Sequence, residues 1–441
     1  QPPPGPGIMA RRVLVIAYYL PPAGGPAVQR NLQFVGPLQQ AGWQPELLTV
    51  RAGAFPNRDP SLLDAIPDDV PVHRTAAFDP LALYAKLSGS DGMPAGSLGN
   101  DDGSWLERLA RWVRANLFLP DARIGWWPFA VRRGTHLLTS GRFDAILTTG
   151  APHSVHLIGR SLHRATGIPW VADLHDPWTD ISYYDELPHT TAARRLDAHL
   201  ERSVLREASA VTTVSPSWAD LFASKAENRY TVVENGVDLS EFDTVHPPLT
   251  DAFVLSHVGK LYASRNPTAV WEAIRQLRAD GAVPWLRIRC VGTLDPVVEA
   301  ALRDRGLLDI VERVPFVPHA EALHLMAASP LLLLVIEPFA QAQGMITSKL
   351  YEYLASERPV LGIGPPGGDA DRLLRRHNAG RIVDWHAGDA ARRMIQAHYD
   401  AWANGTPRAG TSRSQLHDHS RMRQAERMAD VLTTITAPAS S

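Results

Sequence analysis

The sequence contains little cysteine, little net charge and no long apolar run. Among its 441 residues there is one cysteine, Cys290, so neither an internal disulfide nor a cysteine-rich zinc site can form. Lys and Arg number 44 and Asp and Glu number 46, which gives a net charge of −2 and no general attraction to nucleic acid. The longest strongly apolar stretch, residues 331–336, is far shorter than the roughly 20 residues of a membrane-spanning helix. We therefore expect no nucleic-acid partner and no membrane span.

The rest of the composition is that of a globular protein, with 45% hydrophobic and 20% charged residues, which excludes disorder as the main state. Short apolar runs, such as those at 13–16, 145–147 and 331–335, alternate with stretches of helical pattern. Such runs are typical of strands buried on both faces of a parallel sheet. The alternation predicts an α/β protein with doubly wound sheets.

The first apolar run follows two arginines and imitates a short signal peptide. It covers only residues 13–20 before a turn rich in proline and glycine, which favours a buried first strand. Because a single cysteine is typical of a reducing compartment, we expect a cytoplasmic protein.

A division of the chain is predicted near residues 241–253, where two consecutive prolines stand among polar residues in the manner of a linker. The first domain would cover residues 9–245, the second residues 250–403, and a tail residues 404–441. In open α/β sheets ligands bind outside the carboxyl ends of the strands, so two such domains would place their sites in a cleft between them.

Two loops carry residues suited to anions. Gly24 and Gly25 follow the first strand and precede a helix, where the backbone can approach a ligand closely. Their spacing is not the dinucleotide fingerprint GxGxxG, so a tight turn explains them equally well. Another strand ends at Gly259 and is followed by Lys260 and Arg265, two cations that could clamp a diphosphate. The alternative there is a solvated basic loop.

Two further segments carry polar groups at the ends of elements. Thr347, Ser348 and Lys349 begin a helix whose amides and hydroxyls suit a phosphate, and Glu352 lies one turn further, where it could bind ribose hydroxyls. The alternative is a capped amphipathic helix. The pair at 175–176, His175-Asp176, ends a strand and could orient a sugar or an attacking hydroxyl, although turn formation and packing also explain it. No spacing typical of a metal site occurs.

Taken in order, these segments resemble the retaining glycosyltransferases of family 4, which have the GT-B fold. The resemblance extends from about Arg12 to Ile435. The matching motifs are Gly24-Gly25, TVSPSWADLF at 213–222, Asn235-Gly236-Val237-Asp238, Gly259-Lys260-Leu261 with Arg265, Tyr351 to Ala355 with Pro359-Val360, and Gly367-Gly368.

The resemblance implies two Rossmann-like domains that face each other across a cleft, with a C-terminal helix that crosses back to the first domain. It implies that the first domain binds a glycan or lipid-linked acceptor and the second a nucleotide-sugar donor. The residues that it places at the donor are Gly24, Gly25, Gly259, Lys260, Arg265, Thr347, Ser348, Lys349 and Glu352. His175 and Asp176 would position the sugar or the acceptor, and neither a cofactor nor a metal ion is expected.

One position departs from the family pattern. The family commonly carries E-x7-E, and eight residues before Glu352 this sequence has Gly344. Glu337 is near in sequence and is a candidate substitute. The donor sugar therefore stays open, as do two alternatives for the whole protein, a nucleotide-sugar epimerase of the same fold and a non-catalytic protein that binds nucleotide sugars.

Residues 104–134 combine aromatic residues at helical spacing with arginines. This pattern suits an anionic membrane surface, and a core-packing helix with solvated arginines is the alternative. Membrane contact would fit a lipid-linked acceptor in bacterial cell-surface polysaccharide or glycoconjugate synthesis, with the protein on the inner face of the membrane.

Overall fold

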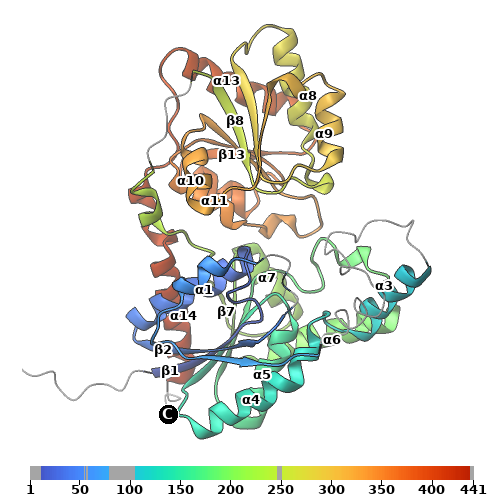
Figure 1. The fold of residues 1–441 in the computed structure, drawn as a ribbon, viewed down its shortest axis with the longest axis vertical. Helices are drawn as coiled ribbons and strands as arrows, with labels where there is room; N and C mark the ends of the chain where they lie inside the picture. The colour runs from blue at the N-terminus through green and yellow to red at the C-terminus, as the bar shows by residue number, and fades with distance from the viewer. Residues whose placement is uncertain (1–10, 54, 56–57, 79–104, 246–250, 438–441) are drawn as a thin grey trace, which may run out of the picture. The chain divides into compact units, whose positions relative to one another are not determined.

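A computed structural model describes residues 11–53, 55, 58–78, 105–245 and 251–437 (Figure 1). Contacts within it form two compact units. Unit 1 extends to Glu234 and resumes at Arg421, and unit 2 covers Asn235–Ser420. The boundary between the two units therefore precedes the predicted linker, and residues 404–420 lie in unit 2. The position of this boundary depends on a contact between distant parts of the chain, since Val237 pairs with Ser420 in a parallel bridge inside unit 2.

Unit 1 contains a parallel sheet of seven strands among the described residues, in the order β3-β2-β1-β4-β5-β6-β7. The strands are β1 (Arg11–Ile16), β2 (Trp43–Val50), β3 (Val72–Thr75), β4 (Ala145–Gly150), β5 (Trp170–Leu174), β6 (Ala210–Thr213) and β7 (Tyr230–Val232). Its helices are α1 (Pro26–Gln40), α3 (Trp105–Leu117), α4 (Trp127–Ser140), α5 (Ser154–Thr166), α6 (Thr191–Glu207), α7 (Pro216–Lys225) and α14 (Arg421–Thr436).

The strand order runs outward in both directions from the neighbours β1 and β4, as in the predicted doubly wound sheet. Every residue of β4 and β5 is buried, which accounts for the largely apolar sequence of these strands. These two strands also bury Thr149 and Asp173, so the sheet must satisfy polar groups in its interior.

The C-terminal helix α14 packs on α1 and completes the core of unit 1. Its Met428 and Leu432 belong to the same buried cluster as Phe34 and Leu38 of α1. The crossing helix that the family resemblance implied is therefore part of the first unit.

Unit 2 contains a second parallel sheet, in the order β10-β9-β8-β11-β12-β13. Its strands are β8 (Phe253–Val258), β9 (Leu286–Val291), β10 (Val311–Val314), β11 (Leu331–Val335), β12 (Val360–Ile363) and β13 (Gly380–Val383). Its helices are α8 (Thr268–Ala279), α9 (Pro296–Arg303), α10 (His319–Ala327), α11 (Ser348–Ala355), α12 (Asp369–Arg376) and α13 (Gly388–Ala403). Two parallel α/β units of this kind confirm the predicted fold class. Within the described ranges, no helix is both long and apolar enough to cross a bilayer.

Candidate functional site

In unit 2 the carboxyl end of β8 meets the amino end of α11. The hydroxyl of Tyr353 on α11 accepts a hydrogen bond of 3.0 Å from the amide of Val258, which fixes the end of the strand against the helix. Gly259 follows with φ 117°, and a Cβ atom there would collide with Nζ of Lys349. The left-handed φ favours a glycine here, and the missing side chain leaves room for the ammonium group of Lys349.

Lys349 is the cation that this arrangement brings into the strand end. Burial, followed by the nearby charge of Arg265, lowers the pKa of Lys349 to about 8, and the carboxylate of Glu352 opposes that change. His257 lies on β8 beside it. Burial and then Lys349 lower the pKa of His257 to about 3, so this imidazole is neutral at pH 7.

Arg265 reaches the end of β11. Its Nη2 and Nε atoms lie 3.3 Å and 3.4 Å from Oε2 of Glu337, in a partly buried ion pair. Lys260 is exposed in the same loop. The structure thus gathers Arg265, Lys349 and Glu352 around the end of β8 and adds Glu337, whereas Gly344 is buried in a short 3-10 helix and offers no side chain.

The start of α11 leaves a hydroxyl unsatisfied. Thr347 is the N-cap residue, yet its side chain makes no capping hydrogen bond, and its buried Oγ1 atom has no partner among the described residues. A buried polar atom without a partner carries a free-energy cost unless a ligand or a water molecule satisfies it. Together with the amides of the first turn of α11, this hydroxyl makes the end of β8 suited to an anionic group.

In unit 1, Gly24 and Gly25 form the turn between β1 and α1. Gly25 has φ 107°, and a Cβ atom on Gly24 would lie 3.0 Å from Cβ of Asp59. The backbone of Gly25 therefore favours glycine without any ligand, and a side chain at Gly24 would need a small shift of Asp59. Their contact with a donor stays a prediction.

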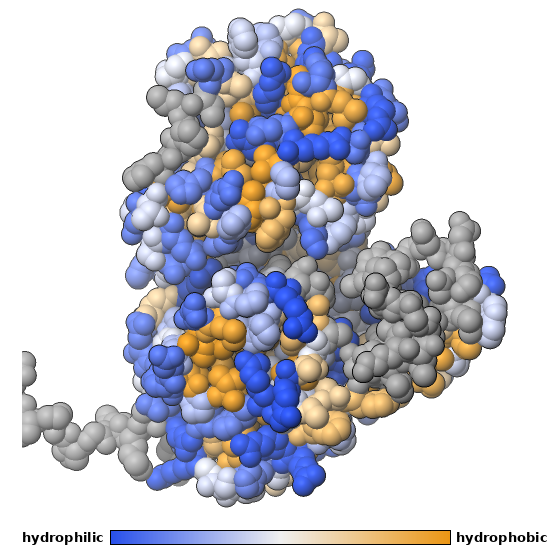
Figure 2. Space-filling model, in the orientation of Figure 1, coloured by the Kyte–Doolittle hydropathy of each residue, from blue (hydrophilic) through white to orange (hydrophobic). Residues whose placement is uncertain are grey.

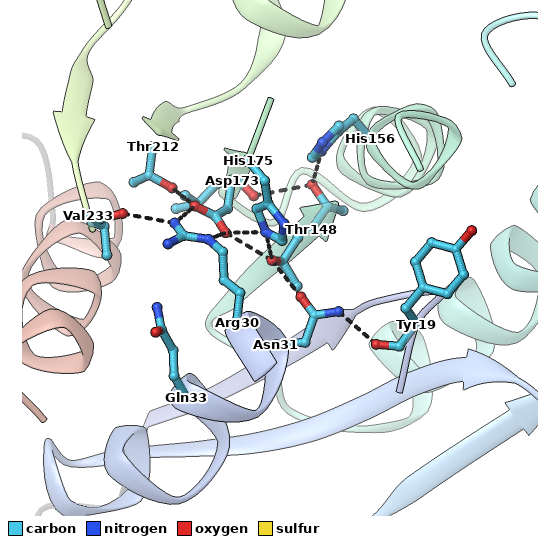
Figure 3. Close-up of polar contacts among 12 residues, drawn as sticks. Tyr19, Arg30, Asn31, Gln33, Thr148, His156, Asp173, His175, Thr212 and Val233 are labelled. Carbon is cyan, nitrogen blue, oxygen red and sulfur yellow. Dashed lines mark hydrogen bonds and ion pairs between the residues drawn. The ribbon is translucent and has the colours of Figure 1, made fainter. Parts of the chain in front are cut away.

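A network of buried polar side chains crosses the sheet of unit 1 (Figure 3). Arg30 on α1 donates to both oxygens of Asp173 on β5, at 2.6 Å and 3.1 Å, and both side chains are almost completely buried. The guanidinium also donates to the carbonyl oxygens of Val233 and Glu234. Thr212 donates to the same carboxylate at 2.7 Å. Burial alone would raise the pKa of Asp173, but the charges and hydrogen bonds of Arg30 and His175 together outweigh it and hold this pKa far below its usual range.

His175 is attached to this network. Its Nε2 atom lies 2.7 Å from Oγ1 of Thr149 and 3.1 Å from Oδ2 of Asp173. Burial lowers the pKa of His175, although Asp173 opposes the change. A neutral, tethered imidazole is suited to holding its neighbours in place, and Asp176 follows it at the same sheet edge, partly exposed. Their roles toward a substrate stay predictions.

Sequence reasoning did not identify Arg30 and Asp173. Asp173 stands inside an apolar run, and a charged residue at a fully buried strand position signals a buried partner. That signal was present in the sequence, but it does not name the partner, which is 143 positions away along the chain.

The loop after His175 is anchored by a buried carboxyl group. Asp197 on α6 accepts hydrogen bonds from Nε1 of Trp178 at 2.8 Å and from the hydroxyl of Tyr184 at 2.9 Å. Burial raises the pKa of Asp197 to about 6, despite these two hydrogen bonds. His153 stacks on Trp178 with ring centroids 4.9 Å apart. The loop is therefore packed on a titratable group.

We expect Asp197→Asn to change how stability depends on pH. The pKa of Asp197 is about 6 in the folded protein against an ordinary value of 3.8, so the folded state binds this proton more tightly. The contribution of Asp197 to the free energy of unfolding is most favourable below pH 3.8 and falls as the pH rises to 6. Above pH 6 the ionised group lowers stability by about 3 kcal/mol, at 1.36 kcal/mol for each pKa unit. Asparagine has no such dependence.

Urea unfolding of both proteins between pH 4 and pH 7.5 measures this effect. The stability of the variant relative to the unaltered protein should rise between pH 4 and pH 6 and stay level above. A difference that is the same at every pH would show that Asp197 is ionised throughout.

Comparisons with known proteins agree with this architecture. Residues 94–241 match the family described as Glycosyltransferase Family 4. No curated protein sequence matches the chain. Sucrose-phosphate synthase from Thermosynechococcus elongatus has a TM-score of 0.60 at 15% identity, with 97% of this chain and 96% of that chain covered. A glycosyltransferase from Rickettsia africae reaches 0.63 at 12% identity, with 97% and 99% covered. The Anabaena protein HepE in complex with UDP-glucose reaches 0.57 at 14% identity, with 96% and 97% covered.

Proposed function

We propose that the chain is a glycosyltransferase of family 4 with the GT-B fold, and that it is a retaining enzyme that transfers a sugar from a nucleotide-diphosphate sugar to a glycan or lipid-linked acceptor. The observation that carries this proposal is the group of cations at the end of β8, where Lys349 fills the space beside Gly259 and Arg265 stands next to it. A structural relative that binds UDP-glucose supports a nucleotide-sugar donor.

The reaction breaks the bond between the anomeric carbon of the sugar and the phosphate oxygen, and it leaves a charged nucleoside diphosphate. Lys260 and Arg265 would stabilise this leaving group, and electrostatic stabilisation of this kind often contributes more to catalysis than any other single effect. The acceptor oxygen bonds to the same carbon on the same face, and its proton passes to the leaving phosphate oxygen. The chain's own cations serve the diphosphate, so the proposal includes neither a metal ion nor a cofactor.

The other predicted residues have narrower roles. Glu352 would bind the ribose hydroxyls, and the start of α11 at Thr347 and Ser348 would donate to a phosphate. Gly24 and Gly25 of unit 1 would approach the donor phosphates, and His175 and Asp176 would position the sugar or the acceptor. Because Gly344 provides no carboxylate for the sugar, we propose that Glu337 does so when the diphosphate takes over its partner Arg265.

A thermal-shift screen against nucleoside diphosphates and nucleotide sugars tests the donor site. A ligand at 100 times its dissociation constant adds about 2.7 kcal/mol of stability, which is a visible shift. We expect one base to be selected and the shift to disappear in Lys260→Ala/Arg265→Ala. The absence of a shift with every nucleotide would contradict the donor site.

Product analysis separates the alternatives. A transferase needs an acceptor and gives a product that keeps the donor's anomeric configuration. Epimerised nucleotide sugar formed without acceptor would indicate the epimerase, and donor binding without turnover on any acceptor would indicate the non-catalytic protein.

We also propose that the acceptor is lipid-linked and that unit 1 contacts an anionic membrane surface, at the inner face of a bacterial membrane. The outer side of α3 exposes Trp105 (64%), Leu109, Trp112 and Leu117 (66%), with Arg108 exposed beside them. Figure 2 shows hydrophobic surface where α3 lies in Figure 1. Asn116 anchors the helix to residues 188–190, which leaves this face outward. Indoles and arginines together suit the interface of an anionic bilayer.

Vesicle flotation tests this surface. We expect the unaltered chain to float with vesicles of phosphatidylglycerol and phosphatidylcholine, and Trp105→Ser/Trp112→Ser to weaken binding by at least about tenfold, since each buried large apolar side chain contributes roughly 1.5–3 kcal/mol. Trp285→Ser, which removes an equally exposed indole from unit 2, is the matched control and should float as before. Equal loss in both variants, or no flotation at all, would rule out docking through α3.

A further inference from the structure

A hollow lies in unit 2, at the amino ends of the strands and therefore on the side of the sheet opposite to the carboxyl end of β8. It is bounded by the start of β12 and β13 and by α13, and it encloses about 440 Å³. Because parallel strands present their amino ends at one edge and their carboxyl ends at the other, this hollow is separate from the proposed donor site. Its lining comprises Pro359, Arg375, Asn378, Ala379, Gly380, Arg381, Met394, His398, Arg408 and Ala409.

The charged side chains that line this hollow are all positive. Three of its residues are arginines and none is acidic. Arg375 is already neutralised, because its Nε atom lies 2.8 Å from the buried carboxylate of Asp371. Arg381 and Arg408 form no ion pair with any residue in the described part of the chain. Two guanidinium groups are therefore available to a ligand.

His398 provides a polar group inside the hollow. His398 is 8% exposed, and within the described ranges neither of its ring nitrogens forms a hydrogen bond. Burial and then the charge of Arg408 lower the pKa of His398 to about 4. A neutral imidazole at pH 7 has one donor and one acceptor nitrogen, which suits a hydroxyl or a phosphate oxygen.

From these contacts we propose that the hollow is a second anion site, which binds a phosphate monoester of the size of a sugar phosphate. Arg381 and Arg408 match the two charges of the phosphate, and their forks suit its oxygens. His398 hydrogen-bonds to the ester, and Met394, Pro359 and Ala379 pack against its carbon skeleton. The volume is within the range of small-molecule sites.

Binding of glucose 6-phosphate, followed by titration calorimetry, tests the proposal. The measurement uses the full chain with Lys260→Ala/Arg265→Ala, so that the proposed donor site takes no phosphate. We expect saturable binding, a loss of tenfold or more in affinity on adding Arg381→Gln/Arg408→Gln, and a smaller loss on adding His398→Gln. Arg393→Gln removes an exposed arginine from the same helix outside the hollow and should change the affinity by less than about twofold.

Two further probes identify the chemistry. Inorganic phosphate should bind more weakly at the same residues, and glucose should not bind. Equal losses in Arg393→Gln and Arg381→Gln/Arg408→Gln, or heat that never saturates, would show unspecific attraction to a basic surface and overturn the proposal. Because the donor site is silenced in every arm, these results are independent of glycosyl transfer.

Discussion

Asp173→Asn is expected to destabilise unit 1 by about 3–5 kcal/mol, the range found when one partner of a buried ion pair is removed. The substitution keeps the volume of the side chain and removes the charge that faces Arg30. Arg30 would then be a buried cation with only neutral acceptors, and Thr149 and Thr212 would lose a charged acceptor. The asparagine amide would also place a hydrogen-bond donor next to the donors of Arg30, Thr149 and Thr212, where it cannot pair with them.

Arg164→Gln provides the matched control for this prediction. It breaks the ion pair with Glu207, whose two hydrogen bonds of 2.6 Å are as short as those of Arg30, but the Arg164 side chain is 60% exposed. Exposed pairs contribute at most about 1 kcal/mol. Urea unfolding of both variants at pH 7 compares them. Similar losses of stability would mean that burial adds nothing to the Arg30–Asp173 pair.

Replacement of either cation of the proposed diphosphate clamp is expected to have the largest effect on catalysis. Lys260→Ala and Arg265→Ala should each reduce kcat by about 10²–10³, the loss found when one group that stabilises developing charge is removed. The physical reason is that negative charge grows on the leaving diphosphate during bond breaking, so contacts with it strengthen in the transition state. The effect should therefore be larger on kcat than on KM.

Steady-state kinetics with the donor selected in the thermal-shift screen measures this loss. Arg275→Ala is the control, because it removes an arginine from the exposed surface of α8, where its partner is Glu272. Unaltered kcat in a folded Arg265→Ala protein would remove Arg265 from the clamp. A rise in KM alone would make it a binding residue without a part in bond breaking.

The fold was readable from the sequence because its central strands contain apolar runs. β4 and β11 are buried at every position, so period-two alternation never obscured them. The division into units was less accurate, since it depends on the bridge between Val237 and Ser420, which no local pattern reveals. The two prolines near 247, on which the predicted boundary rested, lie outside the described residues.

The candidate site in unit 2 was predictable to the extent that it is local. Gly259, Lys260 and Arg265 share one loop, and Thr347 to Lys349 share one helix start, so their spacing carried the information. The contact between Gly259 and Lys349 joins two distant segments, as does the pair of Arg265 with Glu337. The same holds for Arg30 and Asp173 in unit 1. These pairings follow from sheet order, which the sequence does not state.

The position of α14 has a consequence for the order of events during synthesis. A ribosome releases residues 11–234 long before Arg421–Thr436, yet Met428 and Leu432 fill part of the core that Phe34 and Leu38 begin. The core of the nascent first unit therefore stays incomplete, with an apolar groove exposed to solvent, while the whole of unit 2 is translated. Unit 2 is an unbroken stretch of chain and can fold in that interval. Unit 2 can therefore complete its fold before unit 1, although most of unit 1 is translated earlier. Until α14 is made, chaperones would bind the open apolar groove of unit 1.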